Sequence, residues 1–171
     1  MKRGYIALAL ASLALAGCAA NGESHSVAST APAHPEARAY DASAEAKGDV
    51  DAALQRAAAS GKLVLLAMGA NWCHDSRAFA GWMETPRFRN LIADKYELVY
   101  VNVGMPQSKD GHNLDIAERL GVEVKGTPTI VIISPENGVL NAETAAGWRN
   151  AASRSEDEIF NELASYHAAA G

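Results

Sequence analysis

An uninterrupted apolar run at residues 63–68 constrains the fold of this chain more than any other segment. All residues of the run are apolar, whereas a strand with one solvent-facing side alternates apolar and polar residues. The run therefore predicts a central strand that is covered on both faces. Because such strands belong to sheets with helices on both sides, the run indicates an α/β domain.

A single thiol follows this predicted strand, where a helix is expected to begin. Trp72 and Cys73 precede His74, Asp75 and Ser76. The first turn of a helix has unpaired backbone N–H groups, which stabilise a thiolate. The third residue after Cys73 is Ser76 and not a second cysteine. We therefore expect Cys73 to begin thiol–disulfide exchange without being able to complete it alone.

The residues after Cys73 can each change its reactivity. A protonated His74 would favour the thiolate, Asp75 would oppose it, and the Ser76 hydroxyl can donate a hydrogen bond to it. The alternative interpretation is that these are ordinary polar residues of an exposed helix start. A buried, chemically inert cysteine is the corresponding alternative for Cys73.

The N-terminus has the features of an export signal. Two basic residues precede an apolar stretch, residues 5–16, that is too short to span a bilayer comfortably. The stretch leads into Leu-Ala-Gly-Cys18, which resembles the lipobox of bacterial lipoproteins, so residues 1–17 would be removed and Cys18 would carry lipid. By the same resemblance, Ala19 favours the outer membrane, facing the periplasm. The alternative is a plain secretory signal with a chance cysteine.

Composition divides the rest of the chain into a linker and one domain. Residues 18–47 contain few large apolar side chains, so we expect a flexible, lipid-anchored linker. His25 and His34 lie in it and are expected to be solvated and too sparse to bind a metal. Residues 48–171 have the length of a single domain. The whole chain has 20 acidic and 15 basic residues without a basic cluster, which argues against a nucleic acid partner.

Periodicity and turn signals predict the elements of this domain. A strand at residues 98–103 should run parallel to the strand at 63–68, because helical segments connect them. The expected elements are helices at residues 49–59, 77–83, 85–95, 113–120 and 155–167, strands at residues 98–103 and 130–133, and an antiparallel partner strand within residues 139–148.

Two motifs in this order of elements resemble the thioredoxin superfamily. They are W-C-x-x-S at residues 72–76, after the first core strand, and G-T-P-T at residues 126–129, before the third. The Thr85-Pro86 break after the active-site helix, followed by Phe88 and the strand at residues 96–103, is most similar to the periplasmic thioredoxin-like domains of this superfamily. The resemblance covers residues 48–168. It implies a thioredoxin fold, which is a central mixed sheet flanked by helices.

The resemblance also implies roles for individual residues. Cys73 would be the catalytic nucleophile, with Trp72 packed beside it. Pro128 would follow a cis peptide bond and face the thiol, and the backbone of Thr127 would bind an extended substrate like an added strand. The residues alone leave an ordinary trans proline at a strand start as the alternative.

Two departures from the family pattern concern the second thiol. Ser76 replaces the second cysteine of the dithiol motif, and Ala67 stands where the family often has a buried acid that helps to move the proton of that thiol. The two departures agree with each other. They fit a working monothiol protein, and equally a redox-silent domain.

Three functions follow from these observations. The first is thiol–disulfide exchange with client proteins, as an oxidoreductase or isomerase, in which a partner reductase or a small thiol resolves a mixed disulfide on Cys73. The second is a redox-silent module that binds an extended peptide, and the third is an accessory protein of the envelope. We expect no cofactor and no metal, because the adjacent side chains of Cys73 and His74 rarely converge on one ion. The expected site is catalytic Cys73 with Trp72, His74 and Ser76 in support.

Overall fold

The computed structural model describes Met1, residues 34–136 and residues 138–166. The predicted signal peptide, the predicted lipidation site Cys18 and the linker residue His25 lie outside these residues. Within the part described, no helix is both long enough and apolar enough to cross a membrane.

A four-stranded mixed sheet forms the centre of the domain, with the strand order β2-β1-β3-β4. β1 (Leu63–Gly69) pairs in parallel with β2 (Tyr96–Asn102) and antiparallel with β3 (Thr129–Ser134), which in turn pairs antiparallel with β4 (Gly138–Val139). All residues of β1 and β3 are buried. The predicted central strand, the parallel partner and the mixed sheet are thus confirmed.

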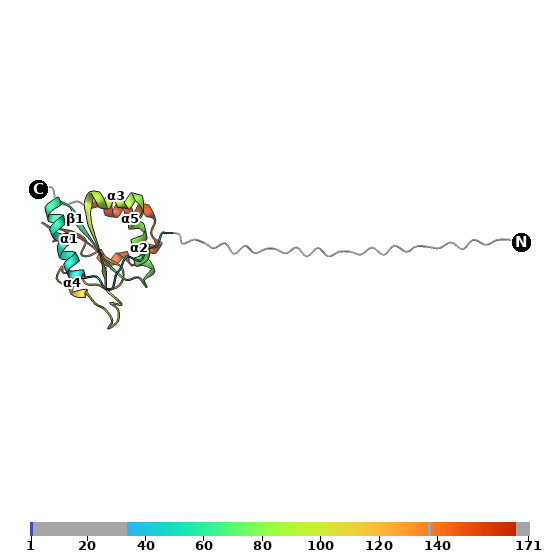
Figure 1. Cartoon of the computed structure of the whole chain (residues 1–171), viewed down its shortest axis with the longest axis horizontal. Coiled ribbons are helices and arrows are strands. Elements are labelled where there is room, and N and C mark those ends of the chain that lie inside the picture. Colours follow the sequence, from blue (N-terminus) through green and yellow to red (C-terminus); the bar gives the residue numbers. More distant parts are fainter. Residues whose placement is uncertain (2–33, 137, 167–171) are drawn as a thin grey trace. The chain divides into compact units, whose positions relative to one another are not determined.

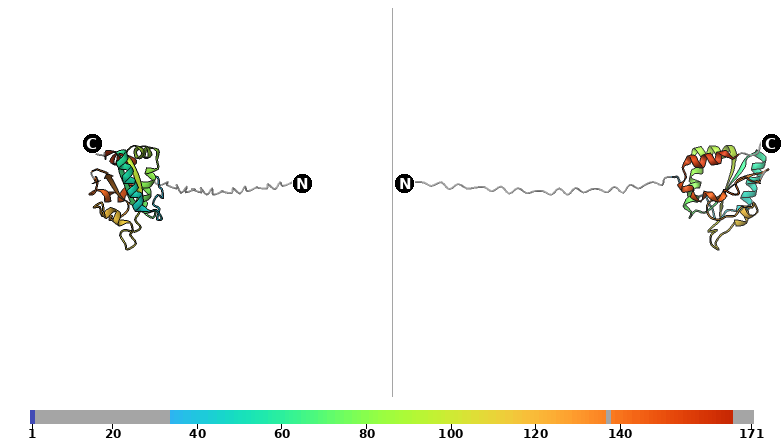
Figure 2. Two further views of the ribbon diagram at one scale, coloured as in Figure 1. Left: turned by 60° about the vertical axis from the view of Figure 1, so that its left-hand side comes forward. Right: turned by 180° about the vertical axis from the view of Figure 1, so that it is seen from behind.

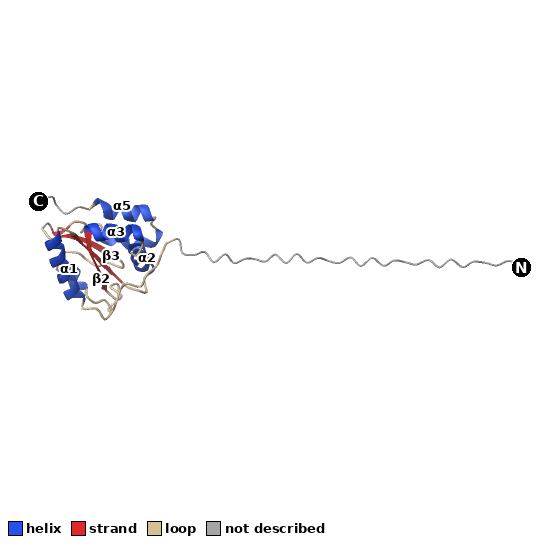
Figure 3. Ribbon diagram, turned by 45° about the horizontal axis from the view of Figure 1, so that its top comes forward, coloured by secondary structure: helices blue, strands red, loops and turns tan. Residues whose placement is uncertain are grey.

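Helices cover the two faces of this sheet (Figures 1 and 3). Alternate residues of β1 point to opposite faces, so Leu65 and Ala67 join one apolar cluster and Leu66 and Met68 join the other. In Figure 2, α1 is in front in the left view, and α5 is in front in the right view, which is seen from behind. The first cluster includes residues of α2 (His74–Met83), α3 (Pro86–Lys95) and α5 (Glu156–Ser165), and the second includes residues of α1 (Ala46–Ser60) and α4 (Leu114–Glu118).

Local signals in the sequence mark several helix ends correctly. Gly61 ends α1 in the left-handed conformation, with φ 72°. Ser155 and Glu158 form the expected capping box at the start of α5. Thr85 and Pro86 begin α3, although the Thr85 hydroxyl donates to Trp82 O at 2.9 Å and does not cap the helix.

The predicted strand within residues 139–148 is largely wrong. Strand pairing ends at Val139, and a 3₁₀-helical segment, η1 (Ala145–Ser153), follows. Asn141 explains the change, because its side chain bonds Ile132 N–H and Ile130 O of β3, each at 2.8 Å, in place of strand backbone. Trp148 of η1 packs edge-on against Phe79, with ring centroids 5.5 Å apart, and fills the core on the α2 side.

The packed part of the chain begins before the predicted boundary at residue 48. Tyr40 is fully buried in the first apolar cluster, and Ala37 N–H donates to Arg77 O of α2 at 3.0 Å. Asn71 and Asn102 both donate to Tyr40 O, at 2.9 and 3.1 Å. For residues 34–47 the prediction of a flexible linker is therefore corrected. We call residues 34–45 the N-terminal segment.

Candidate active site

Cys73 occupies the position that the sequence predicts for it. Residues 70–73 connect β1 to α2, and Cys73 is the N-cap residue of α2. Its N–H donates to Ala70 O at 3.0 Å, and its C=O accepts from Arg77 N–H at 3.1 Å, which fixes the turn. The side chain makes no capping bond to the helix and is 8% exposed. The thiol therefore lies at the positive end of the helix, close to the surface.

The second motif lies directly across from the thiol. The bond between Thr127 and Pro128 is cis, as the resemblance implies. Cys73 Sγ donates its proton to Thr127 O at 3.3 Å, which connects residues 54 positions apart. This hydrogen bond needs the thiol proton, so it exists only in the protonated form. Thr127 O is consequently occupied by Cys73 only while the thiol is protonated.

Trp72 presents an apolar surface beside the thiol. Its indole N–H donates to Gly104 O at 3.0 Å, in the loop that follows β2, and this bond fixes the ring on that loop. The side chain is nevertheless 52% exposed. The next residue of the loop, Met105, is 46% exposed, and apart from Met1 these are the two exposed large apolar residues in the described part of the chain. An apolar surface flanks the thiol as a result.

Ser76 does not contact the thiol in the way that the sequence suggests. It is fully buried, and its hydroxyl oxygen accepts from Ala70 N–H at 3.4 Å, so the expected bond from Ser76 to Cys73 is absent among the described contacts. Gly69 lies so close that a Cβ there would be 2.6 Å from the Tyr40 ring and 2.7 Å from Ser76 Oγ. Ser76 therefore closes the turn between strand and helix.

Tyr40 is a site residue that the sequence interpretation missed. It lies in the predicted linker, but its ring packs beside Ser76 and Gly69 underneath the turn that carries Cys73. Its hydroxyl is buried and has no hydrogen-bond partner among the described residues. Burial raises the pKa of Tyr40 well above its ordinary value, so the phenol stays neutral. A lone aromatic residue in a polar tract is the signal that marks it.

His74 contacts the N-terminal segment. Its Nε2 lies 2.8 Å from Nε2 of His34 and 3.9 Å from Oε1 of Glu36. His34 is buried, so the prediction of a solvated linker histidine is wrong. Support of the thiolate by His74 stays a prediction. Sequence patterns do not predict this contact, because its partners are separated by 40 positions and one of them lies in the predicted linker.

Asp75 has a structural partner far along the chain. Its Oδ1 accepts from Ala152 N–H at 2.9 Å, at the end of η1. The bond joins α2 to the segment that follows β4, on the side of the sheet that carries the thiol. Asp75 is therefore more than a polar residue at an exposed helix start.

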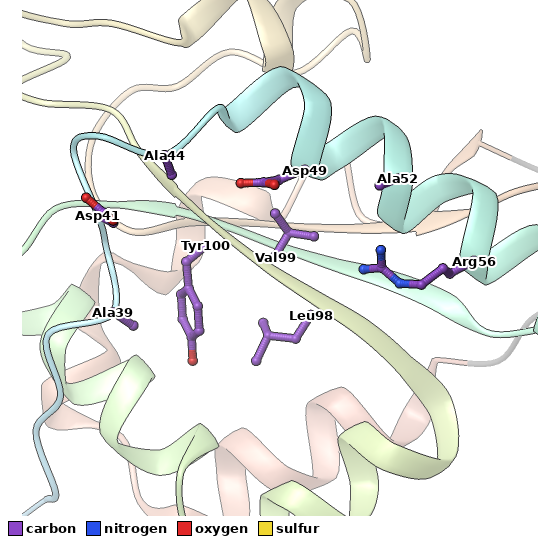
Figure 4. Close-up of a pocket in the computed structure, with 9 residues that line it drawn as sticks. All are labelled: Ala39, Asp41, Ala44, Asp49, Ala52, Arg56, Leu98, Val99 and Tyr100. Carbon is purple, nitrogen blue, oxygen red and sulfur yellow. The ribbon is translucent and has the colours of Figure 1, made fainter.

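A separate pocket lies on the open edge of the sheet (Figure 4). Asp49 and Arg56 of α1 line it on one side, and Leu98 and Tyr100 of β2 line the other. Its lining includes neither Cys73 nor any residue of the two motifs. The pocket is therefore separate from the candidate active site.

Comparison with known proteins agrees with this geometry. A family model described as thioredoxin-like matches residues 44–135, more than half of the chain, and includes both Cys73 and Pro128. The chain belongs to the thioredoxin-like family. The comparison with curated proteins found no match to this chain.

Two solved structures are similar to this thioredoxin-like chain. One is the crystal structure of a disulphide isomerase from Xylella fastidiosa Temecula1, with 27% identity and a TM-score of 0.66, covering 75% of this chain and 95% of that one. The other is the solution structure of a thioredoxin from Thermus thermophilus, with 22% identity and a TM-score of 0.47, covering 67% of this chain and 80% of that one.

Proposed function

We propose that this thioredoxin-like protein exchanges thiols and disulfides with client proteins through Cys73. One observation carries the proposal: the Cys73 thiol lies at the start of α2 and faces the cis peptide bond of Thr127 and Pro128, 3.3 Å from Thr127 O. The similarity to a solved disulphide isomerase supports the same class of reaction. The protein would then act as a monothiol oxidoreductase or isomerase.

The reaction has two balanced steps. The Cys73 thiolate attacks one sulfur of a client disulfide, so that a Cys73–client disulfide forms, the client S–S bond breaks, and the other client sulfur leaves as a thiolate. A small thiol or the thiol of a partner reductase then attacks this mixed disulfide and releases Cys73. Alternatively, another thiol of the same client attacks it, which isomerises the client without net oxidation or reduction. Among the described residues, Cys73 is the only cysteine, so none of them can take over this step.

The surface around the thiol supports a protein substrate. Trp72 and Met105 are exposed beside the site, and apolar groups on an otherwise polar surface favour contact with a partner chain. Thr127 and Pro128 lie across from the thiol, where an extended client segment can approach. We therefore expect clients to bind as unfolded or extended segments.

A peptide-binding module without redox activity is the second candidate. The observation that favours it is the thiol itself, which is largely buried and donates its proton to Thr127 O. In this case the exposed surface at Trp72, beside the thiol, would bind a peptide and Cys73 would be incidental. A role as an envelope accessory protein would depend on the lipid anchor and not on the thiol.

The location that we propose follows from the N-terminal sequence. Residues 1–17 would be a signal peptide, and lipid on Cys18 would hold the protein at the outer membrane, facing the periplasm. Mass spectrometry of the mature N-terminal peptide tests this directly. A Cys18 peptide with acyl chains supports the anchor, and an unmodified Cys18 or cleavage elsewhere contradicts it.

Isomerisation of a scrambled disulfide-bonded protein in a glutathione buffer tests the proposed activity. The full-length Cys18→Ser protein should accelerate the reaction, because only Cys73 remains as a thiol, and the full-length double variant Cys18→Ser, Cys73→Ser should not. Far-ultraviolet circular dichroism checks that both variants are folded. If the double variant accelerates the reaction as well as Cys18→Ser does, the proposed role of the thiol is wrong, and retained peptide binding would favour the second candidate.

A further inference from the structure

We propose that His34, Glu36 and His74 form a binding site for a divalent transition-metal ion beside the thiol. Each residue offers one ligand atom, and these atoms all lie within 4.8 Å of one another. Two imidazole nitrogens and one carboxylate oxygen suit Zn²⁺ and similar ions, and three protein ligands leave a position open for water or a substrate group. The site lies between the N-terminal segment and the first residue of α2.

The fold holds these ligands together through the backbone. Ala37 N–H donates to Arg77 O at 3.0 Å, which fixes the N-terminal segment along α2. Gly81 permits the close approach, because a Cβ there would be only 2.3 Å from Pro35 O. His34 itself is buried. The segment that carries two ligands is thus fixed against the helix that carries the third.

The hydrogen bond of His34 leaves its other ring nitrogen available for a metal. Nδ1 lies 3.2 Å from Pro35 O, and a carbonyl can only accept, so Nδ1 carries the proton. In the neutral ring, Nε2 then presents its lone pair toward His74. Metal-bound histidines use this same arrangement, in which the outer nitrogen bonds a carbonyl and fixes the tautomer.

The spacing of the two rings fits an ion after a small movement. The two Nε2 atoms are 2.8 Å apart, which is a hydrogen-bond distance. Zn–N distances of about 2.0–2.1 Å in a tetrahedral site place the two nitrogens roughly 3.3 Å apart, so the rings must separate by about half an ångström. The side chain of His74 is 58% exposed and has room to make this movement.

Glu36 is oriented so that one oxygen remains for the ion. Arg77 Nε donates to Glu36 Oε2 at 2.9 Å, while Oε1 lies 3.9 Å from His74 Nε2. The hydrogen bond from Arg77 also lowers the pKa of Glu36, so the carboxylate is charged at neutral pH. Arg77 NH1 donates to Trp72 O at 3.0 Å as well, which links this carboxylate to the turn that carries Cys73.

An ion at this site would act on the neighbouring thiol. His74 follows Cys73 directly, so a bound cation adds positive charge beside the thiol and favours its ionised form. This consequence rests on the proposed function, whereas metal binding itself does not. The two claims can therefore fail separately.

Zinc affinity of the full-length protein, measured by competition with a chromophoric chelator, tests the site. We expect one Zn²⁺ per chain and an affinity more than about tenfold lower in His34→Ala and His74→Ala, with a smaller loss in Glu36→Gln. The matched controls are His25→Ala and His112→Ala, and both should bind as the unchanged protein does. His74→Ala is the decisive variant, because His74 is the more exposed of the two histidines and its removal leaves the core intact.

The absorption spectrum of the Co²⁺-loaded protein identifies the ligands. We expect d–d bands without a thiolate-to-cobalt charge-transfer band, and we expect Cys73→Ser to bind Zn²⁺ as tightly as the unchanged protein. If His74→Ala keeps the full affinity, or if either control variant loses it, the proposed site is wrong. A thiolate band that disappears in Cys73→Ser would also overturn it, since Cys73 would then be a ligand.

Discussion

Replacement of Gly81 by alanine should push the N-terminal segment away from α2. A Cβ at this position would lie 2.3 Å from Pro35 O, 2.4 Å from Pro35 C and 2.6 Å from Glu36 N. Ordinary contacts of a Cβ atom begin near 3.4 Å, so the segment must move by about 1 Å. All three neighbouring atoms belong to the backbone, and no side-chain rotation can relieve the clash.

Two opposing effects determine how Gly81→Ala changes the free energy of unfolding. Over-packing of this kind lowers the free energy of unfolding by about 1–3 kcal/mol. Alanine in place of glycine in a helix contributes about 0.5–1 kcal/mol in the opposite direction. We therefore expect Gly81→Ala to be less stable by about 1–2 kcal/mol. The affected contact is the one that positions His34 and Glu36.

Urea denaturation of the full-length protein, followed by far-ultraviolet circular dichroism, measures this change. Gly48→Ala is the matched control, because Gly48 also lies in a helix but has no atom within 4 Å of the added Cβ. The control should gain up to about 1 kcal/mol. Hydrogen exchange at Ala37 N–H should become faster in Gly81→Ala only. The reasoning is refuted if Gly81→Ala is as stable as the unchanged protein or more stable.

Three further outcomes follow from the site and the helix ends. Asp75→Ala should lose about 1–2 kcal/mol of stability in urea denaturation, because Ala152 N–H loses its acceptor, whereas Asp75→Asn keeps an oxygen there and should lose less. Hydrogen bonds from Ser155 lower the pKa of Glu158, so the stability from this contact is complete above the ordinary range of a glutamate and is lost as the pH falls below that range. Melting temperatures between pH 7 and pH 3 should therefore fall less steeply for Glu158→Gln. Trp72→Ala should weaken the binding of extended client peptides in a fluorescence assay while leaving the melting temperature nearly unchanged, and equal peptide affinity would contradict the proposed client surface.

The local elements of the fold could be predicted from the sequence because their signals are local. The apolar run at residues 63–68 has the composition of a strand buried on both faces, and β1 is such a strand. The spacing of Ser155 and Glu158 predicts the start of α5 without any tertiary information. The position of Cys73 could be predicted for the same reason, because the residue lies between a strand and a helix that local sequence signals both predict.

The features that the sequence did not predict depend on tertiary contacts. The N-terminal segment has one large aromatic residue, Tyr40, and its partners Asn71 and Asn102 lie 31 and 62 positions away. The Asn141 side chain makes hydrogen bonds to the backbone of β3 that a neighbouring strand would otherwise make. The β-propensity of the segment does not predict this. The contact between His34 and His74 exists only because the segment folds back on α2.

The most direct test of the account is the intact mass of the full-length Cys18→Ser protein during incubation with a disulfide-linked peptide. The account predicts one peptide adduct per chain on Cys73, and this adduct should persist until an external thiol is added, because the variant has no second cysteine. Absence of the adduct under native conditions, together with its formation in denaturant, would show an inert buried thiol and would contradict the central claim.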